Sequence, residues 1–315
     1  MPSWNDLLAE ANQHDEAVRG QWLMQKLTTA LQDVGRLRAA DGAEPRNVLL
    51  YGSAFLQKGA LPSETLLITH EDLNGFMSVI YGMDWDRGLT LILHTPGGVT
   101  NAAESVVAYL RSKFASVEVI VPTLAMSAGT MIALGSDRVI MGRQSQLGPI
   151  DPQLGIGPGR TISARAVVEQ FERATKEVLE QVQAAHVWAP ILATLGPSLL
   201  QEAQNSLEYS ESMVARWVSK WMLADDADPE TAGRAVAHHF NDASTHKSHG
   251  RRIDRDEARR QQVKVEDLEI DQDLQEAVLT AYHVMTIMFE QSKVTKMLAS
   301  DMGRSWLKSW AGTQP

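Results

Sequence analysis

Cysteine is absent from this chain of 315 residues. Its absence excludes disulfide bonds, thiolate nucleophiles and zinc sites built from thiolate ligands. A chain without cysteine fits a reducing compartment, where disulfides rarely form, and we therefore expect a cytoplasmic protein. Hydrophobic residues make up 44% of the chain, enough for one sizeable core with a helical appendage or for two modest domains.

Long apolar runs and positive charge are also scarce. No window holds the roughly 18 apolar residues that a membrane span needs, and the first residues lack the pattern of a secretory signal. The net charge of −10 argues against binding nucleic acid through a broad basic face. One basic cluster is interrupted by acidic residues and predicts a solvated helix face. It consists of Arg251, Arg252, Arg255, Arg259 and Arg260.

The first half of the chain alternates between short apolar strands and helices. Strands are predicted over residues 47–51, 89–93, 117–121 and 138–141. Helices are predicted over residues 69–83, after Ser127, and from Asn101, which we expect to cap its helix with Glu104 in the capping-box position. This alternation favours an α/β fold with a largely parallel sheet that is covered on both faces.

Helical patterns dominate the two ends of the chain. Apolar residues recur at helical spacing up to about residue 37, with Ser3 or Asn5 as the first cap. Further helices are predicted over residues 164–186, 198–222, 229–240 and 268–301. We expect the tail, residues 306–315, to fray unless a partner holds it. The predicted division is an N-terminal helical segment (1–44), an α/β core (45–160) and a helical region (161–315).

Ser127 lies where an apolar strand turns into a helix, in the sequence Ala125-Met126-Ser127-Ala128-Gly129. A serine hydroxyl there is a candidate nucleophile, since the small residues that follow leave it accessible. The N–H group of Ala128 can point at the carbonyl oxygen that Ser127 would attack. The alternative is that Ser127 only caps the helix, which is a common role for serine.

A second small-residue turn, Pro96-Gly97-Gly98, follows the preceding strand. Glycine permits positive φ and close backbone approach, so the Gly98 N–H can act as a second donor to the same oxygen. Two such donors would form an oxyanion hole, in which the loss of one typically costs about 10²–10³ in rate. The two turns together indicate a serine hydrolase, most plausibly a peptidase, although a plain strand-to-helix turn is the simpler interpretation of either one alone.

The general base is less clear. No histidine lies between Ser127 and His186, and Lys176 is the only lysine between Ser127 and Lys220. A lysine acts as a base only if burial or nearby positive charge depresses its pKa, in which case activity should rise on the alkaline side. Lys176 with Ser127 would form a dyad; the alternative is an ordinary exposed lysine, since glutamates lie one turn to either side of it.

Histidines and acids further along the chain suggest other roles. His238, His239, His246 and His249 lie near Asp242 and Asp254. Their spacing is too loose to favour a metal site, and we predict no metal and no cofactor. His249 is a possible distant base brought in by folding, and Asp151 is a possible accessory residue. His94, next to the glycine turn, is expected to be a hydrogen-bonded structural group.

Three stretches carry a resemblance to the Clp protease and crotonase superfamily. They are Leu93 to Gly98, Val121 to Leu134 and Leu147 to Gln153. Within the superfamily the chain most resembles the serine dehydrogenase proteinase group, which is similar to signal peptide peptidase A. The chain departs from this group at Thr123, where histidine is frequent, and in lacking the membrane-spanning start of many members. The likeness is good over residues 47–155 and patchy up to residue 268.

The resemblance implies stacked β-β-α units, Ser127 as nucleophile, and Gly98 with Ala128 as oxyanion donors, with Gly97 beside them. It implies a peptide substrate bound as an added strand, and a ring-like or stacked homo-oligomer. The signal peptide peptidase branch resembles a serine–lysine dyad system, which would assign the base to Lys176. In the predicted division, the α/β core would then be catalytic and the helical region would complete the site and make oligomer contacts.

Three functions remain open from the sequence. The first is an ATP-independent serine endopeptidase that cleaves extended or unfolded peptides through an acyl-enzyme. The second is a catalytically weak or inactive scaffold that keeps the oligomeric fold. The third, a crotonase-like acyl-CoA enzyme, needs no serine at position 127 and is therefore the least favoured.

Overall fold

The computed structural model describes residues 3–157, 160–196 and 198–312. Contacts divide the chain into two compact units. The first unit holds the residues up to Leu147 and those from Ile253 onward, and the second unit holds Gly148–Arg252. The division predicted from the sequence, with boundaries after residues 44 and 160 and a catalytic role for the middle part, stays a prediction.

The first unit is built on a sheet of seven strands, in the order β11-β10-β1-β2-β3-β5-β9. The five strands from β1 to β9 in this order are parallel, while β10 and β11 are antiparallel additions at one edge. These strands are β1 (Asn47–Ser53), β2 (Leu89–His94), β3 (Val117–Val121), β5 (Arg138–Met141), β9 (Val265–Asp267), β10 (Val294–Ser300) and β11 (Ser305–Ser309). A smaller pair joins β4 (Leu124–Ala125) to β6 (Gln146–Leu147). The predicted α/β fold with a largely parallel sheet is confirmed.

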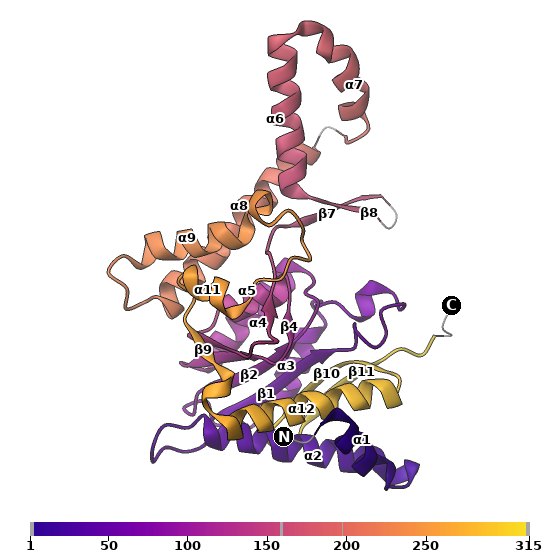
Figure 1. Ribbon diagram of the computed structural model, residues 1–315, viewed down its shortest axis with the longest axis vertical. Helices are drawn as coiled ribbons and strands as arrows, with labels where there is room; N and C mark the ends of the chain where they lie inside the picture. The colour runs from indigo at the N-terminus through magenta and orange to yellow at the C-terminus, as the bar shows by residue number, and fades with distance from the viewer. Residues whose placement is uncertain (1–2, 158–159, 197, 313–315) are drawn as a thin grey trace. The chain divides into compact units, whose positions relative to one another are not determined.

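Helices cover both faces of this sheet (Figure 1). On one face, α2 and α12 pack side by side with α1, over alternate strand residues such as Leu50, Ile92 and Ile120. On the other face lie α3, α4 and α5. The helical elements of this unit are α1 (Trp4–Asn12), α2 (Glu16–Leu37), η1 (Ser63–Thr65), α3 (Asp72–Ile80), α4 (Thr100–Lys113), α5 (Ala128–Leu134), α11 (Arg255–Arg260), η4 (Leu268–Ile270) and α12 (Gln272–Gln291). Because the strands are buried on both faces, their sequences are nearly continuous apolar runs.

The second unit is mostly helical. A two-stranded hairpin of β7 (Gln153–Gly157) and β8 (Arg160–Ser163) leads into it. The helices are α6 (Ala164–Glu180), η2 (Val182–Ala184), α7 (Ala185–Ala193), α8 (Leu199–Trp217), η3 (Val218–Met222), α9 (Pro229–Asn241) and α10 (Ala243–His246). A small core of Val167, Ala203 and Leu207 joins α6 to α8.

Several local predictions were wrong. The helix predicted over residues 268–301 ends at Gln291, and residues 294–300 form β10. The tail does not simply fray, because residues 305–309 pair with β10 as β11; residues 313–315 lie outside the described part of the chain. In both cases pairing with a distant strand decides the structure, which local apolar periodicity cannot register.

Two polar predictions were also wrong. The N-cap of α4 is Val99, with no side-chain cap, so Asn101 lies inside the helix. Arg255 does not lie on a solvated face: its side chain is 6% exposed and pairs with Asp267 and Glu269. By contrast, the predicted Ser3 cap of α1 is confirmed, as a capping box with Asp6.

Candidate active site

The glycine turn after β2, Pro96-Gly97-Gly98, has a backbone conformation with positive φ at both glycines. Gly97 has φ of +101° and Gly98 has φ of +156°, within the range that favours glycine. One side of the turn is paired with Ile68, whose N–H donates to the Gly97 oxygen (2.8 Å) and whose oxygen accepts from the Val99 N–H (2.9 Å). A Cβ on Gly98 would lie only 2.3 Å from the Ile68 oxygen, so the close approach requires glycine there.

Ser127 sits in a strained turn between β4 and α5. Its backbone has φ of 50° and ψ of −117°, a conformation that side-chain-bearing residues rarely adopt and that clusters at functional sites. The Ser127 side chain makes no capping hydrogen bond, so it does not act as the cap that sequence reasoning offered as the alternative. The residue is partly exposed.

The two turns touch. A Cβ on Gly97 would lie 2.7 Å from the Ser127 Cβ and 3.2 Å from the Ala128 nitrogen. Neighbouring bonds fix this approach: the Thr95 N–H donates to the Leu124 oxygen (2.9 Å), and the Met126 N–H donates to the Thr95 oxygen (3.1 Å). Residues about thirty positions apart in the sequence therefore form one small framework.

Two backbone donors of this framework are unused. Among the residues that the structure describes, neither the Gly98 N–H nor the Ala128 N–H has a hydrogen-bond acceptor. Gly98 is only partly buried, and Ala128 is the first residue of α5, where an N–H group has no acceptor within the helix, so both donors remain available to another acceptor. Such donors can bind the oxygen of a polarised carbonyl.

His94 lies behind these turns and is buried. Its Nδ1 hydrogen-bonds with the Thr123 hydroxyl (2.9 Å), and its ring packs between Phe55 and Tyr282. Burial lowers the pKa of His94 to about 3, although a hydrogen bond to the Leu124 backbone opposes the shift. The imidazole is therefore neutral at ordinary pH and has the environment of a structural group.

The second unit holds a histidine and an aspartate in contact. The His249 Nδ1 lies 2.7 Å from Oδ1 of Asp151, whose side chain is 2% exposed. The other carboxylate oxygen accepts a hydrogen bond from the Gln153 amide (2.7 Å). An ionised carboxylate only accepts, so we assign the proton to Nδ1, which leaves the Nε2 lone pair available as a base. The two residues are 98 positions apart, and no local sequence signal predicts their contact.

Lys176, the predicted base, is exposed on α6 in the second unit. It lines an apolar groove of about 530 Å³ with Phe171, Leu179 and Leu200. Ser127 belongs to the first unit, so the Ser127–Lys176 dyad stays a prediction. Within the described residues of the first unit, no ionisable side chain forms a hydrogen bond with the Ser127 hydroxyl.

The loose histidine cluster does not offer free ligands at His246. Its Nε2 contacts the His239 oxygen (2.7 Å), and its Nδ1 contacts the Arg251 guanidinium (3.0 Å). A carbonyl accepts and a guanidinium donates, so both ring nitrogens are engaged.

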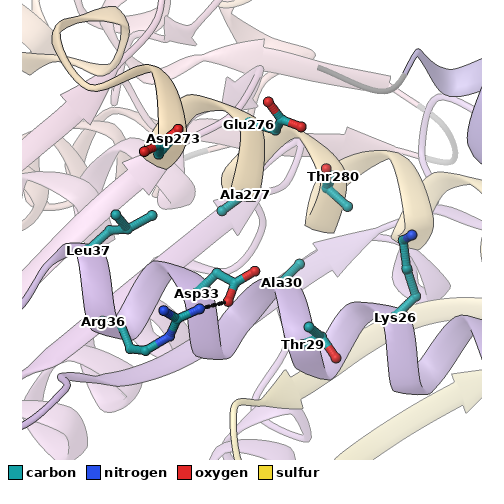
Figure 2. Close-up of a pocket in the computed structure, with 10 residues that line it drawn as sticks. All are labelled: Lys26, Thr29, Ala30, Asp33, Arg36, Leu37, Asp273, Glu276, Ala277 and Thr280. Atoms are coloured by element: carbon teal, nitrogen blue, oxygen red, sulfur yellow. Dashed lines mark hydrogen bonds and ion pairs between the residues drawn. The ribbon is translucent and has the colours of Figure 1, made fainter.

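Another groove lies between α2 and α12, and Figure 2 shows its mixed charges. Its volume is about 490 Å³. The cations there are already paired, Lys26 with Glu10 and Arg36 with Asp33. None of the residues singled out from the sequence lines this groove.

Among the described residues, each helix is either too short or too polar to cross a lipid bilayer.

Comparison with known proteins agrees with the features above. Residues 65–185 match the family described as ClpP-like SDH-type serine proteinase, which confirms the predicted resemblance. Two uncharacterized proteins of Methanocaldococcus jannaschii are each 36% identical to the chain, MJ0137 over 138 residues and MJ1495 over 114 residues. These matches cover 44% and 36% of this chain, and 44% and 37% of the relatives, so less than half of either relative is spanned. A mutant of a membrane-bound stomatin-specific protease has a TM-score of 0.37 and 17% identity, over 63% of this chain and 74% of that one.

Proposed function

We propose that this chain, whose residues 65–185 match the ClpP-like SDH-type serine proteinase family, is an ATP-independent serine endopeptidase acting through Ser127. The observation that carries the proposal is the contact between the two turns. It sets a strained, partly exposed serine against Gly97, with the N–H groups of Gly98 and Ala128 unpaired beside it.

In this mechanism the scissile carbonyl oxygen accepts hydrogen bonds from the Gly98 and Ala128 N–H groups. The Ser127 Oγ attacks the carbonyl carbon while its proton passes to the base. The tetrahedral intermediate collapses, the C–N bond breaks, and the base returns the proton to the leaving amine. Water then attacks the acyl-enzyme by the same route, releasing the acid and regenerating the Ser127 hydroxyl.

The base we favour is His249, held by Asp151. A buried carboxylate bonded to Nδ1 orients an imidazole and stabilises its protonated form, as an activated serine requires. Covalent connectivity supports this assignment. Asp151 follows Leu147 by four residues, His249 precedes Ile253 by four, and Leu147 pairs both with Ala125 and with Ile253. Four extended residues reach at most about 14 Å.

Lys176 is the alternative base, as the resemblance to signal peptide peptidase A implies. Its exposure and its apolar surroundings on α6 do not provide the nearby positive charge or burial that would activate a lysine. His249 therefore has the more suitable environment.

The proposed substrate is an extended or unfolded peptide. Ile68 occupies one edge of the glycine turn, and the Gly98 N–H is left for the other edge. A peptide bound there as an added strand would use backbone hydrogen bonds, which are indifferent to side-chain identity. The proposal needs no cofactor, and it includes a homo-oligomer, as the resemblance implies. The cytoplasmic location stays a prediction.

The runner-up is a scaffold without catalysis. It is favoured by one observation: among the described residues of the first unit, the Ser127 hydroxyl has no hydrogen-bonded base.

A serine-reactive fluorophosphonate separates the two functions. We expect the wild type to be labelled covalently, and Ser127→Ala to lose the label and at least about 10³-fold in peptide hydrolysis. Retained fold in the variant is checked by circular dichroism. A wild type that is not labelled at any pH supports the scaffold.

The same assay identifies the base. We expect His249→Ala to reduce kcat/KM by about 10²–10⁴-fold and Lys176→Ala to change it little. With a histidine base, kcat/KM rises between about pH 5 and 8; with a lysine base, it rises in the alkaline range. The reverse ranking of the two variants would assign the base to Lys176.

A further inference from the structure

The segment Leu66–Thr69, which lines the glycine turn, is held by buried side chains. The Ser53 hydroxyl donates to the Leu66 oxygen (2.6 Å). The Lys296 ammonium donates to the Leu67 oxygen (3.0 Å), and Asp72 accepts from the Thr69 N–H (2.8 Å). Only Ile68, between these points, bonds directly to the glycine turn. The position of Ile68 is therefore fixed by the bonds of its two chain neighbours, Leu67 and Thr69.

Two of these side chains, Lys296 and Asp72, also form an ion pair with each other that is almost fully buried. The Lys296 Nζ lies 2.6 Å and 2.9 Å from the two carboxylate oxygens of Asp72, and the side chains are 1% and 0% exposed. The Tyr51 hydroxyl donates to the same carboxylate (3.1 Å). Burial, together with the charge of Asp72, raises the pKa of Tyr51 well above its ordinary value, so the phenol remains a donor.

A buried ion pair is a poor source of stability. Replacing one by apolar residues of similar size is often neutral or stabilising, because the charges no longer need to leave water. What apolar residues cannot do is hold the Leu67 oxygen and the Thr69 N–H at fixed points. The geometry therefore indicates that the ion pair serves to position Leu67 and Thr69 rather than to stabilise the fold.

We propose that Lys296 and Asp72 are positioning residues for the oxyanion donor at Gly98. They fix Leu67 and Thr69, these fix Ile68, and Ile68 holds Gly97 and Val99 on either side of Gly98. A Cβ on Gly98 would approach the Ile68 nitrogen to 2.4 Å, so a small shift of Ile68 must displace the turn. The inference rests on the proposed function, since it concerns the same site.

The test is the double variant Lys296→Met with Asp72→Leu, which removes both charges together. Loss of a whole oxyanion donor costs about 10²–10³-fold, so misalignment of one should lower kcat by about 10–100-fold. We expect KM to stay constant. Affinity for a peptide aldehyde, which forms a tetrahedral adduct, should fall by the same factor as kcat, whereas affinity for the matching unreactive peptide should not.

The matched control is Arg38→Met with Glu118→Leu, another buried pair, whose Glu118 lies on β3 of the same sheet. We expect its kcat per titrated active site to equal that of the wild type. A wild-type kcat in the Lys296/Asp72 variant would overturn the inference. If that variant does not fold, Ser53→Ala decides, because it removes a single bond to the same segment: a fall of up to about fivefold supports positioning, and no fall overturns it.

The wild type separates this inference from the proposed function. An active wild type with an unaltered Lys296/Asp72 variant overturns only the positioning role. A wild type that neither hydrolyses peptides nor binds the aldehyde overturns the proposed function and this inference with it.

Discussion

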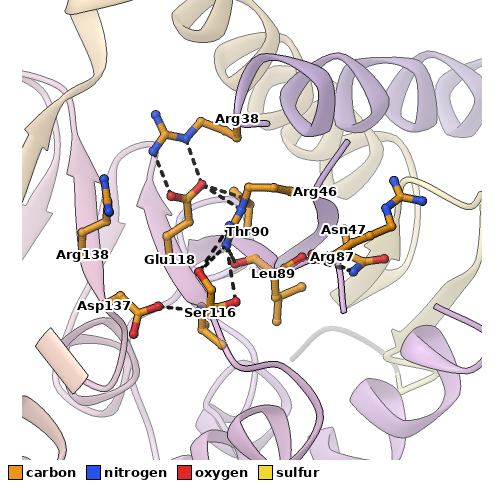
Figure 3. A network of polar contacts seen from close by, with 12 residues as sticks. Arg38, Arg46, Asn47, Arg87, Leu89, Thr90, Ser116, Glu118, Asp137 and Arg138 are labelled. Carbon is orange, nitrogen blue, oxygen red and sulfur yellow. Dashed lines mark hydrogen bonds and ion pairs between the residues drawn. The ribbon is translucent and has the colours of Figure 1, made fainter. Parts of the chain in front are cut away.

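The two ends of the parallel strands in the first unit are built on opposite principles. At the carboxyl end, the chain leaves β2 and β4 through turns with positive φ, and backbone donors are unpaired. At the amino end, Figure 3 shows a network in which Arg38 and Arg46 surround Glu118. Arg38 binds both oxygens of Glu118 (2.9 and 2.8 Å), and Thr90 donates to the same carboxylate (2.7 Å).

This difference shows where the fold keeps destabilising groups and where its buried polar groups are satisfied. Strained backbone and unpaired donors each cost on the order of 1–3 kcal/mol and persist only when their surroundings enforce them. The amino end has the opposite character, since its buried charges are paired and hydrogen-bonded. Substitutions at the carboxyl end should therefore alter catalysis more than stability, and those at the amino end the reverse.

The largest expected effect is at Gly98. Gly98→Ala places a Cβ 2.3 Å from the Ile68 oxygen and must displace the donor N–H. We expect kcat per folded molecule to fall by at least about 100-fold, measured with a peptide substrate after active-site titration. Gly155→Ala is the control, because a Cβ there meets nothing within 4 Å. Equal activities in the two variants would contradict the claim that substitutions at the carboxyl end of the strands alter catalysis.

Breaking the amino-end network should cost stability and spare catalysis. Glu118→Gln leaves the buried Arg38 guanidinium without its main partner, and removal of one member of a buried pair typically costs about 3–5 kcal/mol. Urea denaturation measures the free energy of unfolding. We expect unchanged kcat in the molecules that remain folded, and a large loss of kcat would contradict the comparison.

Acid should weaken the amino end through the same residue. Burial opposes ionisation of Glu118, but hydrogen bonds and charge from Arg38, with the charge of Arg46, outweigh it and lower its pKa. A lowered folded-state pKa contributes stability above the ordinary glutamate pKa of about 4.5, and this is lost as the pH falls through the lowered value. Thermal melts from pH 7 downward should show this loss in the wild type and a smaller one in Glu118→Gln. Parallel curves would exclude Glu118 as the source.

The smallest expected effect is a gain of stability at the carboxyl end. Ser127→Gly relieves the positive φ of 50°, and after the entropy cost of glycine we expect about 1 kcal/mol of added stability. Ser127→Ala keeps the strained backbone and is the matched control. Both variants should be inactive, and differential scanning calorimetry should show a higher Tm only for the glycine variant. A lower Tm would mean that the turn is not strained.

Much of the carboxyl end was predictable from the sequence. Pro96-Gly97-Gly98 and Ala125-Met126-Ser127 each carry a local signal, because small residues and positive φ are properties of a short stretch of chain. Strands β3 and β5 have the predicted bounds, since an apolar run of that length between turns is characteristic of a buried strand. Strand β10 was missed, because its sequence also suits a helix and only its pairing with β1 selects a strand.

The contacts between charged groups were not predictable in the same way. Asp72 meets Lys296 across 224 positions, and Arg38 meets Glu118 across 80. Asp151 meets His249 across 98 positions, and sequence reasoning had named them only separately, His249 as a possible distant base and Asp151 as a possible accessory residue. No periodicity links such residues, because their distance depends on the order and register of the strands.

The amino-acid sequence by itself determined the α/β class, the two small-residue turns and the serine in the second of them, because each depends on local backbone preference and on alternation of apolar and polar residues. Tertiary structure alone decided that the turns touch, that the glycine turn is braced by Ile68, and that particular acids and bases are paired. The reason is that these features depend on distances between segments far apart in the chain, and those distances exist only once the sheet has assembled and both of its faces are packed.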